Sequence, residues 1–257
     1  MFAPIKILST SKKLSPLKTL RTLKNLGVFV VALSVSAASF ATPKEFRAEY
    51  ELYRNGKLLG SSQIALSKSR GGYQFSTTSA SEGGWASLLG GAEIKEVSEF
   101  NLNGDAFQPV SYSYRQSVSV KTRKRDITFD WNKKWAREDD GDNVVSYLLE
   151  PGSLDRNLVV LALAEDLKAQ RTSLNHFVAY KGEAVTWNFK NAGTEKVSTA
   201  LGIIEANRVE RVRDNKDRST TSWHAAKYDY LPIKIQQLEP NGDSIEMRLK
   251  RMNIAAK

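Results

Sequence analysis

The 257-residue chain contains no cysteine and only two histidines, and these shortages exclude several kinds of chemistry. Without cysteine there is no disulfide, no thiolate nucleophile, no thiolate metal site and no N-terminal cysteine to carry a lipid anchor. The two histidines, His176 and His224, are far apart in the sequence, and no His-Glu-x-x-His spacing that would place two histidines on zinc occurs. We therefore predict no metal site and no lipoprotein anchor.

The chain also lacks the glycine-rich loops that bind nucleotide phosphates, both the Walker A loop and Gly-x-Gly-x-x-Gly. The Gly-x-Ser-x-Gly turn that carries the nucleophile of many hydrolases is absent as well. The members of a catalytic triad need not be close in sequence, so a hydrolase that uses His224 with a nearby carboxylate stays open. We expect no cofactor, and we predict that the protein is not an enzyme.

Long hydrophobic runs are missing too. The most apolar stretch, Leu26–Leu33, is shorter than the roughly 20 residues that a membrane-spanning helix needs. It follows a segment with six basic and no acidic residues, and it precedes Ser39-Phe40-Ala41, which has small residues where a signal peptidase reads the chain. We predict a cleaved signal peptide over residues 1–41 and a single periplasmic domain over residues 42–257. The alternative is an uncleaved membrane anchor.

Positive charge is concentrated in this first segment. The chain has 38 Lys and Arg against 28 Asp and Glu, and removing the six basic residues before Ala41 leaves 32 against 28, a net charge of +4. A mildly basic exported domain gives no reason to expect a nucleic-acid partner.

Segments of alternating apolar and polar residues, separated by turn residues, follow Thr42. Asn55-Gly56 is a strong signal for a two-residue hairpin, because both residues tolerate positive φ. The spacing predicts an antiparallel meander that forms a curved sheet, a sandwich or an open barrel. The expected strands are Phe46–Arg54, Leu58–Ser67, Tyr73–Ser79, Ile94–Leu102, Val110–Gln116, Val118–Trp131, Trp135–Glu138, Phe177–Tyr180, Val185–Lys190, Lys196–Thr199, Ile203–Arg213, Ser219–Ala225, Leu231–Glu239 and Ser244–Met252.

One segment interrupts the strands. Leu154–Gln170 is predicted to be a helix, with Ser153 as its N-cap after Pro151-Gly152. Apolar residues cover most of its circumference, and such a helix is normally buried. We therefore expect it to pack against the sheet.

The last third of the chain resembles a known family. The motifs are Glu195–Gly202, Ile204–Val209, Arg218–Ala225 and Tyr230–Ile235, with Gly242 near the end. On these motifs the chain is similar to the exported bacterial family called domain of unknown function 3108, over roughly residues 45–253. The resemblance implies a periplasmic, β-rich protein and carries over no catalytic residue. At the level of fold it also resembles lipoprotein-localisation carriers, in which a curved sheet wraps an apolar helix.

Two segments are candidate ligand contacts. In the basic run 121–125, Lys121, Arg123 and Arg125 share one face of a strand and could contact anionic headgroups; the alternative is a solvated face or a protected sheet edge. Within residues 83–91, glycine pairs flank an apolar stretch with Trp85, Leu88 and Leu89. It could be a gate or a membrane-touching loop; the alternative is a turn that buries Trp85.

A third segment, Asp139–Asn143, has the composition of a calcium-binding turn but lacks the full spacing and the distal glutamate. An acidic, solvated hairpin end is the better interpretation. Taken together, these observations favour a non-enzymatic binding or carrier protein for an apolar or amphiphilic, lipid-like ligand in cell-envelope maintenance, with peripheral membrane contact. The alternatives are a scaffold that binds an envelope protein and the hydrolase.

Overall fold

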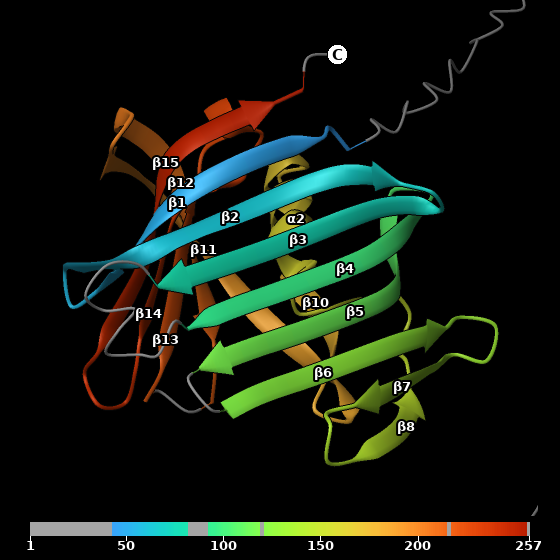
Figure 1. Cartoon of the computed structure of the whole chain (residues 1–257). Coiled ribbons are helices and arrows are strands. Elements are labelled where there is room, and N and C mark those ends of the chain that lie inside the picture. Colours follow the sequence, from blue (N-terminus) through green and yellow to red (C-terminus); the bar gives the residue numbers. More distant parts are fainter. Residues whose placement is uncertain (1–42, 82–91, 119–120, 215–216, 256–257) are drawn as a thin grey trace, which may run out of the picture. The chain divides into compact units, whose positions relative to one another are not determined.

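The computed structural model describes residues 43–81, 92–118, 121–214 and 217–255, which all lie in one compact unit, Phe40–Lys257. In this part of the chain, fifteen strands form a single, mostly antiparallel sheet that is not closed, and one α-helix lies against it (Figure 1). The predicted meander, curved sheet and packed helix are confirmed. Of the forms left open by the sequence, the curved open sheet is the one observed.

The first half of the sheet contains the first eight strands of the chain. They are β1 Phe46–Arg54, β2 Lys57–Ser69, β3 Gly72–Ser81, β4 Glu93–Asn103, β5 Ala106–Val118, β6 Lys121–Asp130, β7 Trp135–Asp139 and β8 Val144–Leu148. The remaining elements are β9 Leu154–Asp155, α2 Val159–Lys168, β10 Leu174–Tyr180, β11 Glu183–Thr199, β12 Gly202–Val212, β13 Ser219–His224, the short 3-10 helix η1 Ala226–Tyr228, β14 Pro232–Leu238 and β15 Ser244–Ile254.

The order of the strands explains how the sheet surrounds the helix. It runs β8-β7-β6-β5-β4-β3-β2-β1-β15-β14-β13-β12-β11-β10-β9, so β1 pairs with β15 in the middle. β8 and β9 are consecutive in the sequence, just before α2, yet they lie at opposite edges of the sheet. Figure 1 shows the sheet curving so that α2 lies between its two halves.

The turn between β1 and β2 forms as its sequence predicts. Asn55 and Gly56 have φ angles of 51° and 75°, as a tight hairpin of right-handed twist requires. Asn55 also ties this turn to β15, because its N–H donates to the carbonyl oxygen of Ser244 and its Oδ1 accepts from the Ser244 N–H, both at 2.8 Å. The hairpin therefore helps to fix the pairing of β1 with β15.

The helix begins later than predicted. α2 spans Val159–Lys168, whereas Leu154–Asp155 forms β9, which pairs in parallel with β10. The predicted N-cap was wrong: the Ser153 hydroxyl donates to the carbonyl oxygen of Glu150 at 2.7 Å. Tertiary pairing with β10 holds the start of the apolar segment extended and so overrides its helical periodicity.

Asp155 takes the place expected of Ser153. Its Oδ1 accepts hydrogen bonds from the N–H groups of Asn157 and Leu158, at 2.9 and 3.0 Å. These N–H groups precede α2 and have no intrahelical partner, so a carboxylate here stabilises the approach to the helix.

Several strand boundaries also differ. The two strands predicted over 185–199 are one strand, β11, because a bulge between Asn191 and Thr194 lets pairing with β12 continue past Gly193. The strand predicted from Val118 to Trp131 is divided, since Val118 belongs to β5 and β6 begins at Lys121. β8 was not predicted, because its sequence Val-Val-Ser-Tyr-Leu does not alternate.

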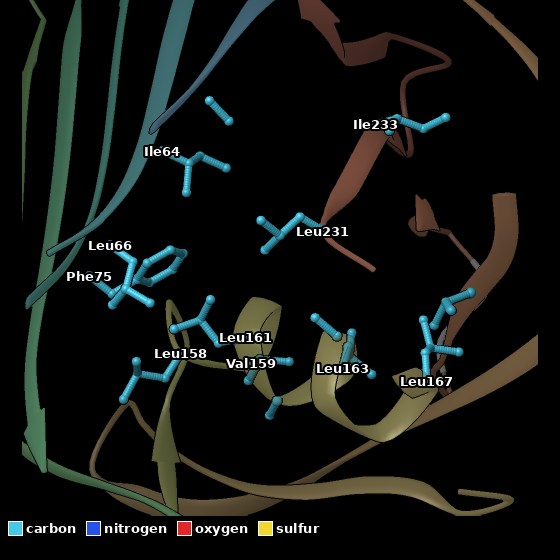
Figure 2. Packing of buried hydrophobic residues seen from close by; sticks show 14 of the residues in the cluster. Ile64, Leu66, Phe75, Leu158, Val159, Leu161, Leu163, Leu167, Leu231 and Ile233 are labelled. Atoms are coloured by element: carbon cyan, nitrogen blue, oxygen red, sulfur yellow. The ribbon is translucent and has the colours of Figure 1, made fainter. Parts of the chain in front are cut away.

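The core is formed between α2 and both halves of the sheet, as Figure 2 shows. Leu158, Leu161 and Leu163 pack in one cluster with residues of the first half, among them Ile64, Leu66 and Phe75, and of the second, among them Leu231 and Ile233. The predicted burial of the helix is confirmed, since seven of its ten residues are buried.

The far ends of the sheet approach each other through a polar contact. Glu138 of β7 accepts hydrogen bonds at Oε2 from the N–H of Gly182, in the β10–β11 turn, and from the hydroxyl of Tyr147 on β8, at 3.0 and 2.9 Å. The predicted signal peptide and residues 82–91 lie outside the described residues. Among the helices that are described, none has the length and apolar character to cross a membrane.

Candidate functional site

A cavity of about 540 Å³ lies between α2 and the inner face of the sheet. Part of its lining is apolar: Val159, Val160 and Leu163 come from α2, Ile64 from β2 and Met247 from β15. Alternate residues of a strand point to the same side, so core strands also supply the cavity wall. The volume falls within the roughly 300–1,000 Å³ that is usual for small-molecule sites.

Another part of the lining is basic. Arg211 of β12 lies over the ring of Trp187 on β11, with its guanidinium carbon 3.4 Å from the ring centroid. Its Nε is buried and has no hydrogen-bond partner. Burial, reinforced by the charge of nearby Arg213, lowers the pKa of Arg211 to about 10, so the side chain stays charged at neutral pH.

Arg213 follows β12 directly and lines the same cavity. It donates a hydrogen bond to the hydroxyl oxygen of Thr220 at 2.9 Å. Burial lowers the pKa of Arg213, and the charge of Arg218 lowers it further. Arg218 is itself paired with Glu239. Arg211 and Arg213, in contrast, have no ion pair among the described residues.

A third arginine of the lining is neutralised. Arg156 donates from Nε and Nη2 to the two carboxylate oxygens of Glu96, at 2.9 and 2.7 Å. The hydroxyl of Tyr112 donates to the same carboxylate at 2.7 Å. This two-point geometry fixes the guanidinium and satisfies the buried glutamate. The pair therefore forms a rigid part of the cavity wall between β4 and the start of α2.

Asp155 and its neighbours form a buried polar network beside the cavity. Asp155 Oδ1 accepts from the hydroxyl of Ser98 at 2.8 Å, while Asp155 Oδ2 has no partner. Burial raises the pKa of the Asp155 carboxyl to about 7, although hydrogen bonds from Leu158, Ser98 and Asn157 act to lower it. The neutral and charged forms of this side chain are thus close in free energy near neutral pH.

His224 lines the cavity but is itself buried. Its Nδ1 lies 2.8 Å from the carbonyl oxygen of Tyr230, and its Nε2 lies 2.8 Å from the hydroxyl of Ser222. Burial lowers the pKa of His224 to about 4, so Nδ1 donates to the carbonyl and Nε2 accepts from the serine. The carboxylate required by the hydrolase hypothesis is not among these partners, and the contacts fit a structural histidine.

The predicted headgroup residues line a second cavity, of about 830 Å³, which shares Arg156, Tyr180 and Lys181 with the first. Arg123 and Arg125 both line it. Arg125 pairs with Glu138 at 2.9 Å and lies over the Tyr180 ring, whereas Arg123 is exposed. The side chain of Lys121 is outside the described residues. A headgroup role for the three stays a prediction.

The position of residues 121–125 in the sheet also fits the alternative interpretation, a protected sheet edge. β6 pairs with β5 along residues 121–128, but it pairs with β7 only from Asp126 onward. Among the residues described, the basic half of β6 therefore has a strand partner on one side only, and charged residues on an open side protect a strand from wrong pairing. The predicted gate residues Trp85, Leu88 and Leu89 lie outside the described part of the chain.

The acidic segment Asp139–Asn143 forms the end of the β7–β8 hairpin. Asp140 accepts hydrogen bonds from the N–H groups of Asp142 and Asn143, at 3.1 and 2.8 Å, and Asp139 pairs with Lys124 at 3.2 Å. The carboxylate of Asp140 thus stabilises the turn, and that of Asp139 forms an ion pair. Among the residues that the structure describes, no group of three or more His, Asp or Glu side chains could hold a metal ion.

Sequence reasoning missed Arg211, Arg213 and Trp187. A signal was present in the sequence. Arg211 and Arg213 lie two and four positions after the buried Val209, so all three residues are on the same face of the strand. An arginine on the core side of a strand marks either an ion pair or a polar cavity. Which of these holds depends on neighbours from other strands, and those are not visible in the sequence of one strand.

Comparison with known proteins supports the fold. The crystal structure of a β-barrel-like protein of the domain of unknown function DUF1849 from Brucella abortus is similar with a TM-score of 0.53 and 10% identity, covering 83% of this chain and 98% of that one. The crystal structure of a candidate lipoprotein from Parabacteroides distasonis covers 83% of this chain and 97% of that one, with 10% identity and a TM-score of only 0.33. Among curated proteins, no sequence is significantly similar.

The family prediction made from the motifs in residues 195–252 is confirmed, and the match extends across most of the strands. The family described as "Protein of unknown function (DUF3108)" matches residues 49–250, and the chain belongs to this family.

Proposed function

We propose that the protein is an exported, non-enzymatic binding or carrier protein for a lipid-like ligand of the cell envelope. The observation that carries this proposal is the cavity of about 540 Å³, whose wall is apolar on α2 and basic on β12. A ligand with an apolar chain and an anionic group matches both parts. Most binding sites of this kind combine an apolar lining with a few placed polar groups.

The apolar wall of the cavity would contact the acyl chain of the ligand. Val160 is only partly buried although it packs on the core, and it lines the cavity beside Leu163. Covering such surface with a ligand removes it from water, which favours binding by about 25 cal/mol for each Å² covered. The cavity is bounded by core residues of α2 and the sheet, so its shape is pre-formed and binding requires little rearrangement.

The gate and headgroup predictions extend this proposal. Trp85, Leu88 and Leu89 would cover the entrance, and Lys121, Arg123 and Arg125 would meet the headgroup or a membrane surface from the second cavity. If Trp85 is part of a gate, Trp85→Ala should change the rates of ligand uptake and release. Unchanged rates would remove Trp85 from the mechanism while leaving the cavity as the binding site.

Native mass spectrometry of the protein purified from its own periplasm tests the proposal directly. We expect a chain that begins at Thr42, with a stoichiometric amphiphile that can be extracted and identified. A protein free of ligand that also fails to bind added short-chain lipids would refute the carrier function. A chain that retains residues 1–41 would refute cleavage of the signal peptide and leave the binding result unaffected.

A cavity-filling variant links the ligand to this cavity. Val160→Trp places a large ring into the space beside α2, and we expect it to lose the bound amphiphile. Val144→Trp is the matched control, because Val144 is 53% exposed on β8 and does not line the cavity. Equal urea midpoints for the two variants would show that the fold is kept. Full lipid occupancy in Val160→Trp would place the ligand elsewhere.

A second candidate function is an interaction protein of envelope assembly. Within the described residues β8 forms one edge of the sheet, and Val144 and Leu148 on it are exposed, as is Trp135 on β7. An extended segment of a partner could add to this edge as a further strand. Capture of an envelope protein that is lost with Val144→Pro, from a protein without bound lipid, would favour this function over the carrier.

A further inference from the structure

The cavity holds more positive charge than its acidic residues neutralise. Within the part of the chain that the structure describes, Glu96 is the one acidic residue of the lining, and it is paired with Arg156. Among the described residues, three cations of the lining have no ion pair: Lys181, Arg211 and Arg213. Glu239 acts on Arg213 through its charge, but its ion pair is with Arg218. An anion from outside the chain would balance this charge.

Among these unpaired cations, Arg211 is in the least favourable environment. Its Nε is buried without a hydrogen-bond partner, and a buried donor that has given up water without a replacement is unfavourable. The Trp187 ring covers one face of the guanidinium, which holds the side chain in place but satisfies none of its N–H donors. The donors on the two terminal nitrogens lie in the plane of the guanidinium, so the ring does not cover them.

The arrangement favours one class of anion. A planar guanidinium offers paired N–H groups that match two oxygens of a phosphate group, and the positive charge of two arginines matches its double negative charge. Arg213 is already held at Thr220 by a hydrogen bond of 2.9 Å, so its remaining donors need little ordering. The apolar residues of α2 line the same cavity, so the anion can belong to an amphiphile.

We propose that Arg211 and Arg213 form a subsite for a phosphate-type oxyanion in the cavity, with Arg211 held by Trp187 as its principal contact. The proposal rests on the proposed function for the position of the apolar chain. It adds the chemical class of the polar group and moves the principal headgroup contact from the run 121–125 to the interior. Two sources share this chemistry, a phosphate-bearing lipid and a free phosphate.

The test compares three probes on the mature protein by isothermal titration calorimetry. They are phosphatidic acid with two hexanoyl chains, the uncharged diacylglycerol with the same chains, and inorganic phosphate. We expect phosphatidic acid to bind at least about tenfold more tightly than diacylglycerol. Hydrogen bonds between charged groups raise an affinity by about this factor or more. In Arg211→Gln the two lipids should bind with equal affinity, and the affinity for diacylglycerol should stay within about twofold of that of the unchanged protein.

Two further variants separate a direct contact from a structural effect. Arg211→Lys keeps the charge but loses the paired donors and the stacking, so it should retain only part of the preference. Arg47→Gln is the matched control, because Arg47 is exposed on β1 and its Nε donates to Gln63. It should bind all three probes as the unchanged protein does. The change in tryptophan fluorescence when phosphatidic acid is added should be smaller in Trp187→Phe.

Each outcome decides between the alternatives. Equal affinities for the two lipids, or a preference that survives Arg211→Gln, would overturn the oxyanion subsite and leave the carrier function standing. Binding of inorganic phosphate that is lost in Arg211→Gln, with no binding of either lipid, would support the subsite and refute the lipid-like ligand. Failure of all three probes to bind would refute both.

Discussion

Asp155 should make the stability of the protein depend on pH, and replacing it by asparagine should remove that dependence. The side chain is fully buried, its Oδ2 has no hydrogen-bond partner, and burial raises the pKa of the carboxyl from 3.8 to about 7. Glu96 lies close enough to raise it further, while Ser98 and the N–H groups of Asn157 and Leu158 face Oδ1. The folded protein therefore holds this proton more tightly than the unfolded chain.

The sign of the effect follows from this difference. The contribution of Asp155 is most favourable below pH 3.8 and is lost as the pH rises through about 7. A difference of about three pKa units corresponds to about 4 kcal/mol in all. Between pH 5 and pH 8 the expected loss from this group is about 2–3 kcal/mol.

Urea unfolding at pH 5 and pH 8 measures the effect. The carboxyl contribution is the difference in this pH dependence between the unchanged protein and Asp155→Asn, since other titrating groups are common to both. Asparagine keeps an oxygen that can accept the Asn157 and Leu158 N–H groups, so the approach to α2 is preserved. Ser98→Ala is a further control, because it removes one hydrogen bond to Asp155 without removing the carboxyl. Equal pH dependence in the unchanged protein and Asp155→Asn would refute the reasoning.

Three more substitutions test the fold, each by urea unfolding at pH 7. Leu158→Ala empties a fully buried position and should cost about 2–5 kcal/mol, whereas Leu148→Ala, at a side chain 64% exposed, should change stability by less than about 0.5 kcal/mol. Gly60→Ala should cost about 1–3 kcal/mol or more, because its Cβ would overlap the backbone of β3; Gly71→Ala has open space and should be tolerated. His224→Ala leaves two partly buried partners, Ser222 and the Tyr230 carbonyl, without this hydrogen bond and should cost about 1–3 kcal/mol. A fully stable variant at any of the three buried positions would contradict the packing described.

Much of the sheet follows from the sequence. Strand alternation depends on local geometry, so a segment such as Phe46–Arg54 shows which residues will be buried without knowledge of its partners. The Asn55-Gly56 turn is equally local, since positive φ is a property of the residues themselves. The apolar circumference of 159–168 also predicts burial, because such a helix is unfavourable in contact with water.

Contacts between distant segments decided the rest. Leu154–Asp155 is extended because β10 pairs with it, and β11 continues through Gly193 because β12 accommodates a bulge there. Neither partner can be identified from the periodicity of the segment itself. The same holds for the start of α2, where Asp155 rather than Ser153 receives the free N–H groups.

The candidate site depends most on tertiary structure. By itself the sequence determined a β-rich domain with a buried helix, its family, and a composition without cysteine chemistry or a nucleotide-binding loop. Only the fold decided that Arg156 would meet Glu96 while Arg211 would meet Trp187 instead of a carboxylate. An arginine has the same sequence signature whether it is paired or free, because its charge is balanced by residues that the chain brings together only when the sheet curves around α2.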